Sequence, residues 1–164
     1  MILMNVIQDI VDYERLERYI IRKNKTSVSI LNGTETKEEL EQLATDVHLY
    51  FGLGCRNVTK LYLPFGYDFI PLLEAFKKFS WLADFHKYKN NYDYNFTLLT
   101  MNKIPTIFGT CLLLTENEAL QSRIAQVHYS FYDNENNVRE ILKNHQSDIQ
   151  CIVSKNPMVG FSNM

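Results

Sequence analysis

A cysteine lies where two sequence patterns meet. Cys55 belongs to the run YFGLGCRN at positions 50–57, between a segment with helical spacing and a segment typical of a strand. Two glycines ahead of a cysteine permit a tight turn and let backbone N–H groups approach a bound atom, as an oxyanion requires. An arginine directly after the cysteine favours the thiolate, which is the nucleophilic form. The run therefore indicates Cys55 as a candidate nucleophile, with Gly54 and Arg56 as its support.

A purely structural interpretation of the same run also stands. Gly52 would end the preceding helix, and Cys55 would be a small buried side chain, as most free cysteines are. The eight residues alone favour this second interpretation. Evidence from the other parts of the sequence is needed to choose between a nucleophilic and a structural Cys55.

Composition limits the classes of protein to which the chain can belong. Its 164 residues suffice for one domain, and 46% hydrophobic with 22% charged residues is ordinary for a globular protein. A net charge of -2 without a basic cluster argues against a nucleic-acid partner. The apolar opening at residues 1–7 is broken by Asp9 and Asp12, so we expect neither a membrane span nor a signal peptide.

The three cysteines are odd in number and widely spaced, at positions 55, 111 and 151. This spacing argues against a disulfide framework and against a zinc site. Reduced thiols fit better, so we expect a cytoplasmic location. Cys111 and Cys151 lie within apolar segments and are expected in the core, and no histidine shows metal-ligand spacing, so no metal is assigned.

The elements that must position Cys55 alternate along the chain. Strands are expected at 26–31, 57–63, 107–114 with an interruption at Gly109, 123–132 and 148–154. Helices are expected at 4–20, 37–51, 68–82 and 134–145, whereas 84–95 is expected to be a loop leading into a short helix near 94–102. Thr36 and Glu39 form a capping-box signature, and Asp68 can cap the next helix. The succession predicts an α/β fold, a layered domain with a mostly parallel sheet.

Several runs together resemble one enzyme family. They are RKNKTSVSIL (22–31), TKEEL (36–40), YFGLGCR (50–56) and KLYLP (60–64), with weaker similarity from NNYDYN (90–95) to IQCIV (149–153). In this order they are similar to the catalytic domain of the bioluminescence-type fatty acyl-CoA reductases, a divergent branch of the aldehyde dehydrogenase superfamily. The resemblance covers nearly the whole chain after about residue 20.

The resemblance implies a chemical course for Cys55. Its thiolate would attack a fatty acyl-CoA or other acyl thioester, and the resulting acyl-cysteine would be reduced by NADPH or NADH to a fatty aldehyde. The backbone N–H of Cys55 is the available oxyanion donor. In the family the cofactor domain comes first in sequence. We therefore expect residues 1–164 to be a single catalytic domain, a fragment whose residues 1–20 form a helical lead-in from a missing cofactor domain. A homo-oligomer is compatible with this picture.

Departures from the superfamily pattern bear on the chemistry. If Lys25 is aligned with the lysine of the Glu-Leu-Gly-Gly-Lys motif, Ile21 takes the place of the glutamate that activates water, although Glu17 could substitute for it. Ser122, in SRIAQV (122–127), takes the place of the glutamate that holds the nicotinamide ribose. The missing glutamate at Ile21 favours reduction or thiol transfer over oxidation to an acid. The serine at position 122 removes an expected cofactor contact, so the cofactor-binding residues stay unknown.

Two other functions remain open. The sequence contains no Gly-x-Gly-x-x-Gly run after a strand, so the chain could be a non-enzymatic interaction or assembly module that retains the fold. A cysteine-dependent thioesterase is the weaker alternative, because no histidine is placed as an obvious base for Cys55. His48 lies beside the apolar stripe of the 37–51 helix, where a hydrogen-bonded histidine is expected.

Overall fold

The described part of the chain forms a three-layer α/β domain around one sheet. The computed structural model describes residues 25–155. The strands are β1 (Thr26–Ile30), β2 (Val58–Pro64), β3 (Thr106–Phe108), β4 (Leu113–Glu116), β5 (Gln126–Tyr132) and β6 (Ile149–Ser154). The helices are α2 (Lys37–His48), α3 (Phe69–Phe76), α4 (His86–Met101) and α5 (Glu135–Asn144), with 3-10 turns η1 (Leu49–Gly52) and η2 (Lys77–Asp84). The expected helix at residues 4–20 lies outside the described residues.

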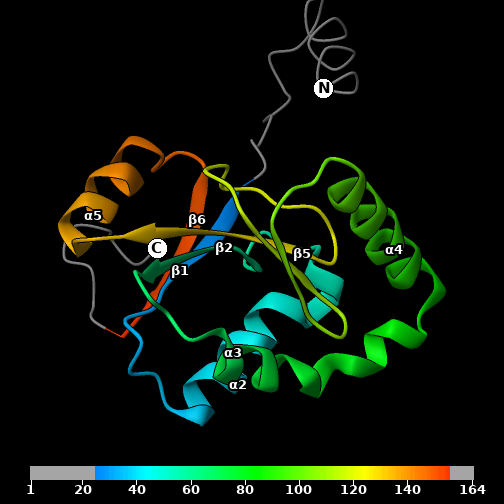
Figure 1. The fold of residues 1–164 in the computed structure, drawn as a ribbon. Helices are drawn as coiled ribbons and strands as arrows, with labels where there is room; N and C mark the ends of the chain where they lie inside the picture. Colours follow the sequence, from blue (N-terminus) through cyan, green and yellow to red (C-terminus); the bar gives the residue numbers. More distant parts are fainter. Residues whose placement is uncertain (1–24, 156–164) are drawn as a thin grey trace, which may run out of the picture.

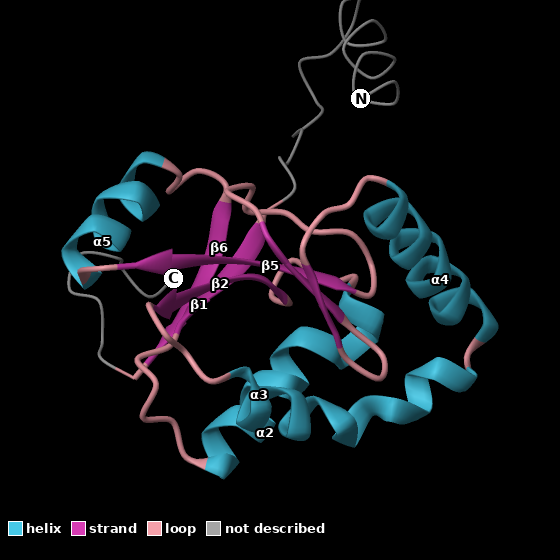
Figure 2. Ribbon diagram, viewed as in Figure 1, coloured by secondary structure: helices cyan, strands magenta, loops and turns pink. Residues whose placement is uncertain are grey.

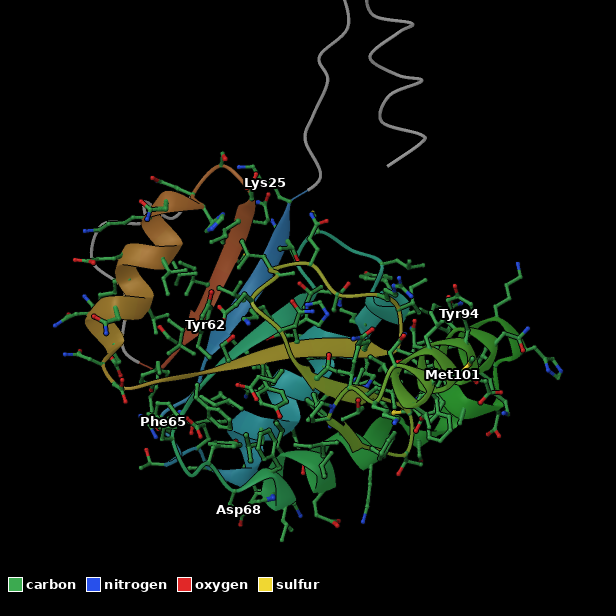
Figure 3. All side chains as sticks on the ribbon, turned by 45° about the horizontal axis from the view of Figure 1, so that its top comes forward. Lys25, Tyr62, Phe65, Asp68, Tyr94 and Met101 are labelled. Atoms are coloured by element: carbon green, nitrogen blue, oxygen red, sulfur yellow. The ribbon has the colours of Figure 1, made fainter. Side chains whose placement is uncertain are left out.

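The sheet is parallel except at one edge, which confirms the predicted fold class. Its strand order is β3-β4-β5-β2-β1-β6, and only the β3–β4 pair is antiparallel. Helices α2 and α3 cover one face, and α5 covers the other (Figure 1). Figure 2 shows α4 beside the sheet rather than on either face. Figure 3 places Lys25, at the start of β1, and Phe65, just after β2, at opposite ends of the sheet.

Two apolar layers fix the sheet between its helices. The larger layer joins α2 and α3 to side chains such as Leu61 and Leu63 of β2, all of them fully buried. The smaller layer joins Val138 and Leu142 of α5 to Val28 of β1. Alternating side chains of one strand thus reach both layers, because successive residues of a strand point to opposite faces.

A register shift precedes the part of β2 that crosses the sheet. Ser27 pairs with Val58 but Val28 pairs with Lys60, so Thr59 is an extra residue on β2. The extra residue lets Val58 and Leu61 point into the same apolar layer while Lys60 points to the opposite face. Without the shift, Lys60 would share a face with Val58, so the shift determines where this lysine lies.

The segment 84–95 was expected to be a loop, and this prediction is wrong. Helix α4 runs from His86 to Met101 and buries only Tyr88, Asn95 and Leu99. This narrow stripe of mixed residue types gives little apolar periodicity. Local contacts supply support instead: Lys89 forms an ion pair with Asp93 at 2.7 Å, four residues further on.

The expected strand 107–114 is in fact two strands, β3 and β4, joined by a tight turn. The Gly109 N–H donates to the Leu112 carbonyl at 2.8 Å, closing the turn. A Cβ on residue 109 would lie 2.9 Å from that carbonyl oxygen, which explains the glycine. The interruption expected at Gly109 is therefore a turn that reverses the chain direction between β3 and β4. The expected strand 123–132 likewise begins only at Gln126.

Candidate active site

Cys55 is exposed in a turn at the amino end of β2. Helix α2 begins at the predicted capping box, with Thr36 and Glu39 each accepting a backbone hydrogen bond from the other. It ends at His48, earlier than expected, because Tyr50 and Phe51 adopt left-handed conformations with φ of 52° and 60°. Left-handed backbone is costly for aromatic residues, which marks this connection as strained. The chain then turns through residues 54–57, hereafter the Cys55 turn.

Asn57 fastens the Cys55 turn to the end of α2. Its side-chain oxygen accepts from the Gly54 N–H at 2.7 Å, and its amide nitrogen donates to the carbonyls of Asp46 at 2.7 Å and Leu49 at 2.8 Å. The side chain is almost fully buried, with 4% exposed. The sequence alone did not identify this role, although glycine and asparagine are both typical turn residues.

The glycine before the cysteine has a structural explanation. A Cβ on residue 54 would lie 2.9 Å from the Asn57 side-chain oxygen, which is closer than Cβ atoms approach. Because the Gly54 N–H already donates to Asn57, it is not free to hold an oxyanion. The Cys55 N–H donates no hydrogen bond to any described residue, so it remains the oxyanion donor to consider. Ser27 holds the Cys55 carbonyl at 3.1 Å from its hydroxyl.

The surface around the Cys55 turn is apolar. Leu49, Tyr50 and Leu53 are exposed, with 76% of Tyr50 accessible. The Phe51 ring contacts that of Phe85 at 5.4 Å between centroids. Arg56 is exposed in the same turn and forms no ion pair with a described residue. An exposed thiol surrounded by apolar side chains suits an apolar acyl group, although the same surface would also suit a protein contact.

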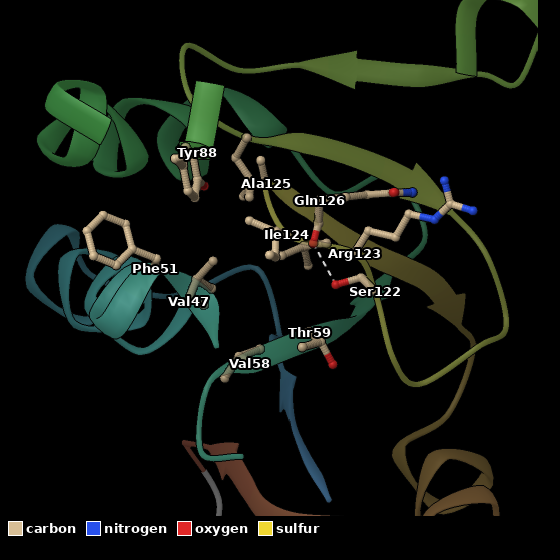
Figure 4. Close-up of a pocket in the computed structure, with 13 residues that line it drawn as sticks. Val47, Phe51, Val58, Thr59, Tyr88, Ser122, Arg123, Ile124, Ala125 and Gln126 are labelled. Atoms are coloured by element: carbon tan, nitrogen blue, oxygen red, sulfur yellow. Dashed lines mark hydrogen bonds between the residues drawn. The ribbon is translucent and has the colours of Figure 1, made fainter. Parts of the chain in front are cut away.

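A pocket lies next to the Cys55 turn because β2 and β5 are parallel neighbours. Segments that precede two adjacent parallel strands meet at the same end of the sheet, so residues 50–59 lie near residues 122–127. These segments, with Val47, Tyr88 and Leu112, line a small, partly open hollow (Figure 4). Cys55 itself does not line the hollow, whereas its neighbours Gly52 and Val58 do.

Ser122, expected near a cofactor, lies in this pocket wall. Its hydroxyl donates to the Gln126 carbonyl at 2.5 Å, which closes a turn in which Ala125 has φ of 61° (Figure 4). A serine engaged with its own backbone is a poor replacement for a carboxylate that binds two ribose hydroxyls. Ser122 therefore does not take over the role of the glutamate that the resemblance places here. Ile21 and Glu17 lie outside the described residues.

The imidazole of His48 contacts the thiol of Cys111 rather than that of Cys55. Its Nδ1 lies 2.8 Å from the Ala44 carbonyl, which can only accept, so Nδ1 carries the proton and Nε2 faces the Cys111 Sγ at 3.6 Å. Burial lowers the pKa of His48 to about 4 and raises the pKa of Cys111 to about 11. Both groups are neutral at pH 7, which makes this a buried S–H···N contact rather than an activated thiolate.

The expectation of a hydrogen-bonded core histidine at position 48 agrees with these contacts. The Phe79 ring stacks on His48 at 4.8 Å, and Cys111 is buried as expected, with 2% exposed. Cys151 is only half buried. Across residues 25–155, no group of three or more metal-ligating side chains is found, and no helix is long and apolar enough to cross a membrane.

These features define an α/β domain that presents a cysteine between the end of a helix and the start of a parallel strand. Solved structures with a similar fold include aldehyde dehydrogenases. The 1-pyrroline-5-carboxylate dehydrogenase from Thermus with bound NAD aligns over 97% of this chain and 42% of its own, with a TM-score of 0.56 and 10% identity. An indole-3-acetaldehyde dehydrogenase in complex with NAD+ aligns over 84% of this chain and 39% of its own, with a TM-score of 0.54 and 8% identity.

The comparisons establish the fold and its extent. The chain has the fold of an aldehyde dehydrogenase catalytic domain and spans about two fifths of the length of these dehydrogenases. The sequence matches no protein-family model and no curated protein. At about 10% identity the structural similarity shows the fold alone and does not show the activity.

Proposed function

We propose that the chain is the cysteine-bearing catalytic domain of an acyl-CoA reductase. The observation that supports this most is the exposed Cys55 thiol, presented at the amino end of β2 among exposed apolar side chains. The other two cysteines differ from it: Cys111 is buried against a neutral histidine, and Cys151 is half buried in a strand. Cys55 is thus the thiol that a large acyl thioester can reach.

The proposed step is acyl transfer onto Cys55. The thiolate sulfur attacks the thioester carbonyl carbon, a new carbon–sulfur bond forms, and the bond to coenzyme A breaks. Coenzyme A leaves as a thiolate and takes up a proton from solvent. The Cys55 N–H is the donor for the intermediate oxyanion, and the apolar residues Tyr50 and Leu53 would lie along the acyl chain. Arg56 is exposed in the same turn.

The reductive step is assigned to another domain of the complete enzyme. Reduction of the acyl-cysteine to a fatty aldehyde requires a hydride from NADPH or NADH, and the sequence contains no Gly-x-Gly-x-x-Gly run that would hold such a dinucleotide. An upstream cofactor domain and a cytoplasmic location belong to this proposal. The chain on its own is expected to accept an acyl group without turning it over.

A long-chain acyl-CoA tests the proposal on the chain as it is. After incubation, intact mass should increase by one acyl group, and Cys55→Ser should abolish the increase. Cys151→Ser is the matched control, because it removes a half-buried thiol and should leave the adduct unchanged. Absence of an adduct on folded protein would refute acyl transfer and favour an interaction module. Free acid released over many turnovers would instead favour a thioesterase.

The interaction module is the second candidate, and the exposed apolar surface supports it. Leu49, Phe51 and Leu53 beside Trp81 and Phe85 form a patch of the kind that contacts other proteins. The adduct experiment separates the two functions, because a surface used only for protein contact requires no reactive thiol.

A further inference from the structure

A charged lysine is buried under the segment that leads from β4 to β5. Lys60 is completely inaccessible to solvent and points to the face of the sheet opposite α2. Its ammonium donates to the Asn117 carbonyl and to the Ser130 hydroxyl. No described carboxylate lies within ion-pair distance of it. Burying an ammonium among mainly neutral acceptors costs several kcal/mol of folding free energy. An apolar side chain at this position would therefore give a more stable protein.

The contacts of Lys60 form part of a larger clamp on residues 117–125, hereafter the crossover segment. Thr59 donates to the Leu120 carbonyl at 2.6 Å, and His128 Nδ1 lies 2.9 Å from the Ala119 carbonyl. With the Lys60 contact to Asn117, side chains of β2 and β5 hold three carbonyls of the crossover segment. The last residues of the crossover segment, with Gln126 and Val127 of β5, form one wall of the pocket beside the Cys55 turn.

We propose that Lys60 is a positioning residue: the hydrogen bonds of its buried side-chain nitrogen to Asn117 and Ser130 hold the crossover segment in place and thereby shape the pocket wall next to Cys55. It acts through Asn117 and Ser130 and touches neither the pocket nor the thiol. Ser130 extends the contact to Glu118, whose carboxylate lies 3.4 Å from the hydroxyl. The Ser130 hydroxyl thus lies between the Lys60 nitrogen and the negatively charged Glu118 carboxylate. The role is independent of acyl transfer, although it concerns the same pocket.

The charge on Lys60 makes the clamp sensitive to pH. Burial lowers the pKa of Lys60 to about 8, against the attraction of Glu118 and Glu116. The other titratable groups nearby are His128 on β5 and Tyr62 on β2, whose ring centre lies 5.3 Å from the ammonium. Burial lowers the pKa of His128 and raises the pKa of Tyr62 to about 12, so both are neutral between pH 7 and 9. Loss of the Lys60 proton across that interval favours the closed arrangement, since the pKa is lower when the lysine is buried than when it is exposed, so a pH-dependent tightening of the crossover segment would report Lys60.

Hydrogen exchange on the whole chain tests the proposal. In Lys60→Met, which keeps length and removes the charge, backbone exchange in the crossover segment should rise about tenfold, the loss of roughly one to two hydrogen bonds. Exchange in β1 should not rise, and the global free energy of unfolding should not fall, because an apolar residue replaces a buried charge. Lys78→Met is the matched control, since that lysine is exposed and paired with Glu41, and it should change neither segment.

The pH profile provides a second, independent readout. The wild-type ratio of crossover exchange to β1 exchange should fall between pH 7 and 9, because Lys60 has a lower pKa in the closed segment than when exposed, and Lys60→Met should show no such fall. If Lys60→Met does not fold, Ser130→Ala removes one acceptor of the ammonium and should raise crossover exchange in the same direction. Unchanged crossover exchange in these variants, or an equal increase throughout the sheet, would overturn the proposal. Neither result depends on whether Cys55 accepts an acyl group.

Discussion

Replacing Asn57 by alanine should destabilise the protein far more than an ordinary asparagine substitution. The side chain makes three short hydrogen bonds to backbone groups, with Gly54, Asp46 and Leu49, at 2.7, 2.7 and 2.8 Å. Each contributes about 1 kcal/mol net, and a buried group left without a partner costs at least as much. We therefore expect the free energy of unfolding to fall by about 3 kcal/mol, a large part of the stability of a small domain.

Urea unfolding followed by circular dichroism measures this effect. Asn91→Ala is the matched control, because the Asn91 amide also donates to a backbone carbonyl, that of Lys87, at 2.7 Å, but on the exposed side of α4. The control should change stability by less than about 0.5 kcal/mol. An Asn57→Ala loss no greater than that of Asn91→Ala would refute the view that Asn57 holds the Cys55 turn against α2.

Two further results follow from the cysteines and from His48. Because Cys55 is exposed and Cys111 is buried with a raised pKa, a neutral-pH thiol reagent should label Cys55 quickly and Cys111 only after unfolding; rapid native labelling of Cys111 would contradict the buried S–H···N contact. His48 has an ordinary pKa of 6.5 when unfolded and about 4 when folded, so its neutral form is favoured in the folded state and stability is lost as pH falls from about 6.5 towards 4. Wild type should lose about 3 kcal/mol more than His48→Phe over that interval in urea unfolding, and equal pH slopes would refute the assignment.

The parallel sheet was predictable because its strands carry strong local signals. Runs such as 26–31 and 57–63 are apolar and β-branched, and Asp68 and Asn134 each cap a helix as their residue types suggest. The long helix α4 was not predictable in the same way. Its buried face consists of Tyr88, Asn95 and Leu99, a stripe that pattern recognition does not distinguish from loop composition.

The location of Cys55 in a turn before a strand followed from its glycines, but its supporting contacts did not. Asn57 bonds to residues up to 11 positions away, and the His48–Cys111 contact joins residues 63 positions apart. Such contacts depend on how α2 packs against its neighbours, and no local pattern encodes that packing. The bulge that turns Lys60 towards the crossover segment is likewise a property of strand pairing.

Peptide mapping after incubation with a long-chain acyl-CoA tests acyl transfer most directly. We expect the acyl group on the peptide that contains Cys55, released by neutral hydroxylamine as a thioester should be, with the Cys111 and Cys151 peptides unmodified in the same sample. An acyl group distributed among the cysteines, or a Cys55 peptide that stays unmodified while the protein is folded, would contradict the proposed role of this thiol.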